Sequence, residues 1–141
     1  DDAFKIYGVD AMSSITVEAL GGLRFSAGTR GHKVSCDLPT ESRGEDSGMT
    51  PPELFLSSLG CCVGVYVIRF CEKNGIQTKG MKIHVSGKGA KEPSRFGNII
   101  FEIEMPTSVP QELRDAVIRA AKACYLHNTL NNPPEMNVIL K

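Results

Sequence analysis

Residues 50–75 constrain the fold more than any other stretch, because they form a long apolar run with clear helix boundaries. No charged side chain occurs between Glu53 and Arg69. Thr50 and Glu53 have the T-x-x-E spacing of a capping box, and Gly75 suits the positive φ at which helices commonly end. The pattern therefore predicts one helix without a polar stripe. A helix of that kind lies in the interior of a protein.

Small residues recur at helical spacing along this stretch, at Ser57, Gly60, Cys61 and Gly64. They predict a seam that another helix can approach closely, because little side chain separates the two backbones. The partner helix could belong to the same chain or to a second copy. A membrane span needs about 20 apolar residues. The run is shorter, contains serines and glycines and stands alone, so we expect no membrane span.

The length of 141 residues predicts a single domain over residues 1–141, with residues 1–12 as a tag remnant or an N-terminal arm. The chain has 16 acidic and 16 basic residues. A balanced charge offers no field that would attract nucleic acid or an anionic membrane, so we expect neither partner.

The five cysteines are odd in number and form no C-x-x-C pair; they are Cys36, Cys61, Cys62, Cys71 and Cys124. This pattern suits a reducing cytoplasm better than a secreted disulfide framework. The three histidines show no ligand spacing relative to the cysteines, so we expect no metal and no cofactor. Buried cysteines usually act as small apolar residues, and that reading is strongest for Cys36 and Cys71.

The segment before the central helix predicts three antiparallel strands and a loop. The strands cover residues 14–19, 23–27 and 33–38, and glycine-rich turns separate them. Residues 39–49 are polar and without periodicity, which indicates a surface loop that leads into the helix.

The segment after the central helix predicts a hairpin, a helix and a last strand. The hairpin has strands at residues 81–86 and 99–105, with a tip at 87–97. Ser108 and Gln111 repeat the capping-box spacing, and the helix that follows presents one face. That face consists of Leu113, Val117, Ala120 and Cys124. Residues 131–134 should break this helix, and residues 136–140 alternate as a strand. The fold class is therefore α+β.

Two motifs resemble the OsmC/Ohr family of thiol-dependent peroxidases. They are TPPELFLSSLGCC at residues 50–62 and AKACYLHNTL at residues 121–130. The resemblance covers nearly the whole chain. It implies an OsmC-like fold, in which antiparallel sheets surround a buried central helix that carries a cysteine. It also implies an intertwined homodimer with two active sites at the interface.

The resemblance implies a role for each of four residues. Cys62 corresponds to the peroxidatic cysteine and Cys124 to the resolving cysteine. The arginine that favours the thiolate comes from the polar segment before the helix, where Arg43 fits best and Arg30 is the alternative. Glu53 is either the residue that holds this arginine or a capping residue.

The sequence departs from the family pattern at three positions. Pro52 stands where well-characterised members have the glutamate that holds the arginine, and Tyr125 stands where many members have proline. Cys61 is an additional cysteine. A disulfide between the adjacent Cys61 and Cys62 is not expected, because the small ring would strain the peptide between them.

The resemblance implies that the Cys62 thiolate attacks an organic hydroperoxide and then forms a disulfide with Cys124, which an external dithiol, such as a lipoyl group, reduces. An apolar lining from Phe55, Leu59 and Tyr66 would favour alkyl hydroperoxides. The alternative is a small-molecule binding protein with the same apolar pocket and little turnover. A third hypothesis is a carrier of sulfur or thiol groups on Cys62.

Overall fold

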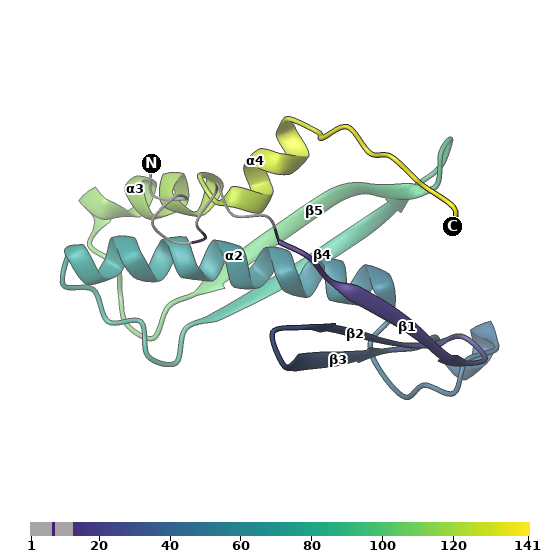
Figure 1. The fold of residues 1–141 in the computed structure, drawn as a ribbon. Coiled ribbons are helices and arrows are strands. Elements are labelled where there is room, and N and C mark those ends of the chain that lie inside the picture. Colours follow the sequence, from purple (N-terminus) through teal and green to yellow (C-terminus); the bar gives the residue numbers. More distant parts are fainter. Residues whose placement is uncertain (1–6, 8–12) are drawn as a thin grey trace. The chain divides into compact units, whose positions relative to one another are not determined.

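A computed structural model describes residue 7 and residues 13–141 of this chain. It confirms an α+β fold with antiparallel sheets (Figure 1). The chain divides into two compact units, residues 1–57 and residues 58–141, and each is described by itself. Apart from Tyr7, the predicted tag remnant or N-terminal arm at residues 1–12 lies outside the described residues.

The first unit contains the predicted three-stranded antiparallel sheet. Strands β1 (Thr16–Gly21), β2 (Arg24–Thr29) and β3 (His32–Cys36) pair in sequence order. Gly21 and Gly22, at φ 112° and 58°, form the first turn, where a side chain would be strained. The glycine and β-strand patterns were therefore sufficient to predict this sheet.

A buried carboxylate organises the loop that follows β3. Asp37 is fully buried, and its carboxylate accepts four hydrogen bonds. The donors are the amides of Leu38 (2.7 Å), Glu45 (3.2 Å) and Ser47 (3.1 Å) and the Ser47 hydroxyl (2.6 Å). These bonds, the Ser47 hydroxyl above all, lower the pKa of Asp37 from 3.8 to about 2 although burial opposes the shift. The loop is therefore held in one shape without regular secondary structure apart from the short 3-10 helix η1 (Thr40–Ser42).

The central helix α2 spans Pro51–Lys73 and begins with the predicted capping box. The Thr50 amide donates to Glu53 Oε1 (2.9 Å), and the Glu53 amide donates to Thr50 Oγ1 (3.3 Å). Gly75 follows the helix with φ 66°, as predicted. Length and hydropathy alone would let α2 cross a bilayer, but the core helix of a soluble protein has the same properties.

Within the second unit, α2 buries one face rather than all faces. Seven of its residues are buried, and these are Leu59, Cys62, Val63, Gly64, Tyr66, Val67 and Cys71. Cys61 is exposed. The prediction of a helix enclosed on every side was therefore wrong for a single chain, because apolar composition does not show how much covering surface the rest of the chain provides.

Two small residues of α2, Gly60 and Gly64, face a strand. A Cβ atom added to Gly60 would lie 2.9 Å from Val85 Cγ2, and one added to Gly64 would lie 3.3 Å from Ile83 Cδ1. Both neighbours belong to β4 (Lys82–Ala90). The predicted close approach is present at these two glycines, but its partner is a strand and not a second helix.

Strand β4 pairs with β5 (Arg95–Glu104) in a long antiparallel hairpin (Figure 1). Val85 pairs with Phe101 and Ile83 with Ile103. The strands extend well into the segment that was predicted as the tip, residues 87–97. The turn that joins them therefore covers only residues 91–94. The glycines of this segment led to the prediction of a turn, because glycine is uncommon in strands. The backbone pairing of the hairpin nevertheless continues through them.

The last two helices differ from the prediction. Helix α3 (Gln111–Lys122) starts after Pro110 without a side-chain cap, so the proposed cap at Ser108 was wrong. A second helix, α4 (Tyr125–Asn131), follows at once. Cys124 lies between them with extended backbone angles, φ −67° and ψ 152°, and not on the face of α3. The chain turns here because the Cys124 sulfur can cap α4, which periodicity alone does not reveal.

The predicted last strand does not form. Residues 133–141 adopt neither helix nor strand, and Met136 and Val138 are 85 % and 98 % exposed. Alternation of apolar and polar residues shows only that a segment suits a strand, because the strand also needs a free edge to bond with.

Candidate thiol site

The second unit brings Cys62 and Cys124 together. Cys62 lies on the buried face of α2 with 3 % of its surface exposed, and Cys124 is completely buried at the start of α4. No disulfide joins the two cysteines in this structure. The Cys62 thiol is close enough to change the ionisation of Cys124 by a hydrogen bond and by charge.

Burial raises the pKa of the Cys124 thiol to about 11. The amide of His127 donates to the Cys124 sulfur at 3.3 Å and offsets part of this rise. The neighbouring Cys62 thiol raises the pKa further. Cys124 is therefore a neutral thiol near pH 7, and a neutral thiol is a poor nucleophile.

The site includes a feature that sequence reasoning missed. Cys124 was predicted on the face of one continuous helix, whereas its sulfur accepts a hydrogen bond from the His127 amide and caps the separate helix α4. The His127 ring also lies 6.5 Å from the Phe101 ring on β5. A possible sequence signal was the three-residue spacing of Cys124 and His127, which is the spacing of a helix cap and the amide that it accepts from.

Cys61 and Cys62 have different surroundings. Neighbouring helix residues point about 100° apart, and the structure leaves Cys61 exposed while it buries Cys62. Cys71 is a further buried thiol on α2, and burial raises its pKa. The buried face that carries Cys62 therefore does not carry Cys61.

The predicted arginines and glutamate lie in the first unit. Arg43 follows η1 with φ 70° and lines a hollow of about 330 Å³ next to Asp37 and Glu45. Arg30 lies in the turn between β2 and β3 with φ 52°. Glu53 uses Oε1 to accept the Thr50 amide, which supports its interpretation as a capping residue. Arg43 and Glu53 are thus in the first unit and the two cysteines in the second.

A second arginine in this hollow was not predicted. Arg24 Nε lies 3.1 Å from Glu45 Oε2, and both residues line the hollow with Arg43. The first unit therefore contains an arginine held by a glutamate, though not the expected pair. This pair leaves little signal in the sequence, because Arg24 lies on a strand and Glu45 on a loop 21 positions later.

Comparison with known proteins identifies the family. The family described as OsmC-like protein matches residues 44–139, which is more than half of the chain. The chain therefore belongs to the OsmC/Ohr family. No curated protein sequence matches the chain.

Solved structures share this fold at low sequence identity. A protein from Psychrobacter arcticus, named for osmotic stress induction and a detoxification response, is 20 % identical with a TM-score of 0.77, and the match covers 84 % of this chain and 88 % of that one. An OsmC-like protein from Mycoplasma pneumoniae is 23 % identical with a TM-score of 0.69, covering 88 % and 90 %. An organic hydroperoxide resistance protein OsmC from Legionella pneumophila is 18 % identical with a TM-score of 0.63, covering 85 % and 90 %.

Proposed function

We propose that this protein reduces organic hydroperoxides, with Cys62 as the peroxidatic cysteine and Cys124 as the resolving cysteine. The observation that carries the proposal is the pair of buried cysteines from α2 and the start of α4, in which the Cys62 thiol lies close enough to raise the pKa of Cys124. Family membership supports the same chemistry, because a structural relative is named for organic hydroperoxide resistance.

The reaction proceeds in two steps. The Cys62 thiolate attacks the terminal oxygen of the O–O bond, which breaks, and the alkoxide leaves as an alcohol after taking up a proton. Cys62 is then a sulfenic acid. The Cys124 sulfur attacks the Cys62 sulfur, water leaves, and a Cys62–Cys124 disulfide remains. An external dithiol in a reducing cytoplasm exchanges with this disulfide and restores both thiols.

The ionisation of Cys124 supports this division of roles. With a pKa of about 11, Cys124 stays protonated near pH 7 and does not compete for the hydroperoxide. It attacks only after the sulfenic acid has formed beside it, when the reaction is intramolecular and proximity compensates for a low thiolate fraction.

Turnover with a dithiol tests the proposal. The protein should consume cumene hydroperoxide when dihydrolipoamide is supplied and form one cumyl alcohol for each hydroperoxide. Alkyl hydroperoxide should be preferred over hydrogen peroxide, because the surroundings of Cys62 on α2 are apolar. No consumption above the rate of free dithiol would contradict an enzymatic role.

One observation favours the alternative, a small-molecule binding protein. Pro52 stands where the family has its glutamate, and one of the two carboxylate oxygens of Glu53 already accepts the Thr50 amide in the capping box. Native mass spectrometry after gentle purification distinguishes the two functions. A retained ligand with no hydroperoxide turnover would support the binding protein.

We predict that Arg43 favours the reactive form of Cys62 through its charge. Arg43→Met should slow alkylation of Cys62 near pH 7 by about tenfold or more. A nearby cation commonly lowers the pKa of an acidic group by about 1 or more, and each step of 1 changes the ionised fraction about tenfold. The measurement is the pH dependence of iodoacetamide labelling in the Cys61→Ser background. Arg30→Met and Arg24→Met are matched variants, and slowing in one of these instead of Arg43→Met would transfer the role to that arginine.

We also predict an obligate homodimer. Within one chain, several large apolar side chains of the first unit are exposed, including Ile15, Val17 and Met49. Exposed apolar surface of this kind is expected to be covered by a second subunit. Light scattering at micromolar concentration should give twice the chain mass. A monodisperse monomer would rule the dimer out.

A further inference from the structure

A hollow of the second unit lies between β5 and α3, and neither Cys62 nor Cys124 lines it. Its volume is about 690 Å³, which lies within the roughly 300–1,000 Å³ of ligand pockets. Ten residues line it: Phe101, Ile103, Met105, Pro106, Thr107, Ser108, Val109, Arg114, Val117 and Ile118. The hollow is thus distinct from the thiol pair, although Phe101 both lines the hollow and has its ring 6.5 Å from the His127 ring.

The lining is apolar on the two walls that face each other. Phe101, Ile103 and Met105 alternate along β5 and its end and therefore lie on one face of the strand. Val117 and Ile118 are three and four residues after Arg114, so all three share one face of α3. The chain of an aliphatic molecule would contact apolar side chains from both elements.

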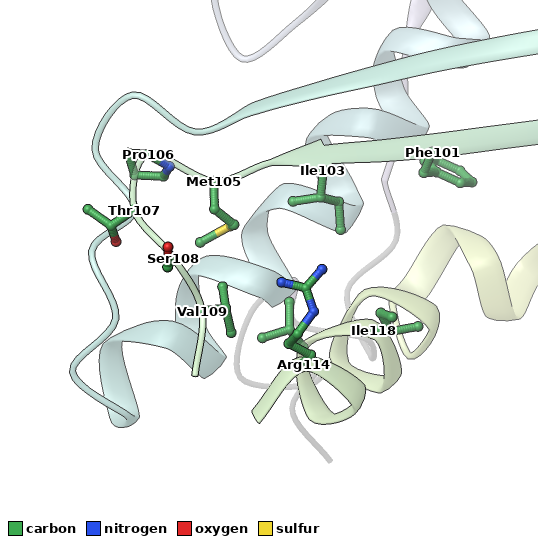
Figure 2. Close-up of a pocket in the computed structure, with 10 residues that line it drawn as sticks. Phe101, Ile103, Met105, Pro106, Thr107, Ser108, Val109, Arg114 and Ile118 are labelled. Carbon is green, nitrogen blue, oxygen red and sulfur yellow. The ribbon is translucent and has the colours of Figure 1, made fainter. Parts of the chain in front are cut away.

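Arg114 is the one charged residue among the ten. Figure 2 shows its side chain extending from α3 toward β5, between Met105 and Ile118. Across the described part of the chain, no hydrogen bond or ion pair engages its guanidinium group. A cation at an apolar hollow is suited to an anion, and guanidinium groups bind carboxylates through two parallel hydrogen bonds.

The nearest acidic residues of β5 do not compete for this cation. Glu102 and Glu104 alternate with the lining residues and therefore lie on the opposite face of the strand. Glu104 is engaged there by His84 at 3.0 Å. The hydroxyl groups of Thr107 and Ser108 add donors at the rim of the hollow, and Figure 2 shows both on the loop after β5, with Met105 and Val109 between them and Arg114.

We propose that this hollow binds the carboxylate form of a medium-chain fatty acid, with Arg114 on the carboxylate and the aliphatic chain between β5 and α3. The charge selects an anion, and the apolar walls select an aliphatic tail over a small polar acid. Binding needs neither thiol, so the site is independent of the peroxidase reaction.

Isothermal titration with decanoate, below its micelle concentration, tests the site on the full chain. Decanoate should bind saturably with one molecule per chain, and decanol should bind about tenfold to a hundredfold more weakly, because it lacks the charge that Arg114 recognises. Cys62→Ser should bind decanoate as the unchanged protein does, so that loss of the proposed peroxidase function does not affect this result.

Variants of α3 complete the test. Arg114→Met should weaken decanoate binding to the level of decanol, whereas Arg119→Met, an exposed arginine of the same helix outside the hollow, should leave it unchanged. Equal binding of decanoate and decanol would overturn the role of Arg114, and this comparison needs no variant to fold. Absence of saturable binding would overturn the site. A second copy of the chain that covers the hollow would give this result.

Discussion

Replacing Cys62 by serine should reduce hydroperoxide consumption by at least about a thousandfold, because the nucleophile of the first step is lost. Serine is nearly the same size as cysteine, so the packing of α2 should be kept. The measurement is cumene hydroperoxide consumption with excess dithiol, combined with a melting curve that confirms folding.

Cys61→Ser is the matched control, since it makes the same substitution one position earlier on the same helix. Its turnover should stay close to that of the unchanged protein, because Cys61 is exposed while Cys62 is buried near Cys124. The opposite outcome, in which Cys61→Ser is inactive and Cys62→Ser is active, would mean that the family motif aligns one residue earlier on this chain.

Asp37→Asn should lower the melting temperature by about 10 °C, because at least one buried donor loses its acceptor. The carboxylate accepts bonds from three amides and one hydroxyl, and an amide group has only one oxygen to offer. Asp46→Asn is the control in the same loop, since it removes the same charge and keeps a residue that tolerates the φ of 54° found there.

The stabilising effect of Asp37 should depend on pH. Because folding lowers its pKa from 3.8 to about 2, its contribution is complete above pH 4 and is lost as the pH falls toward 2. The difference in melting temperature between the unchanged protein and Asp37→Asn should therefore shrink over this range. An equal difference at pH 7 and pH 2.5, or an equal loss in Asp46→Asn, would show that the carboxylate does not hold the loop.

Local features of the fold could be predicted from the sequence because their partners are close along the chain. The capping box joins Thr50 and Glu53, which are three residues apart, and Gly21, Gly22 and Gly75 sit where positive φ is needed. The prediction of a last strand was wrong. Residues 136–140 alternate as a strand does, but alternation does not show whether another strand has a free edge to pair with. The predicted cap at Ser108 was wrong, because the residue directly before α3 is Pro110 and no side chain caps the helix.

The candidate site could be predicted only in part, since its members are far apart along the chain. The apolar composition of residues 50–75 placed the whole helix in the interior without distinguishing Cys62, and the resemblance to a family, not the spacing, paired Cys62 with Cys124 some sixty residues later. The Arg24–Glu45 ion pair depends on a tertiary contact between a strand and a loop, and no local pattern in the sequence encodes it.

Intact mass spectrometry after one equivalent of cumene hydroperoxide tests the central proposal most directly. We expect a loss of about 2 Da from the reduced chain, because one thiol hydrogen is transferred to the alcohol and the other to water, and recovery of the original mass with a dithiol. Peptide mapping should place the new disulfide between Cys62 and Cys124. An unchanged mass, or a disulfide that omits either of these two cysteines, would contradict the proposed mechanism.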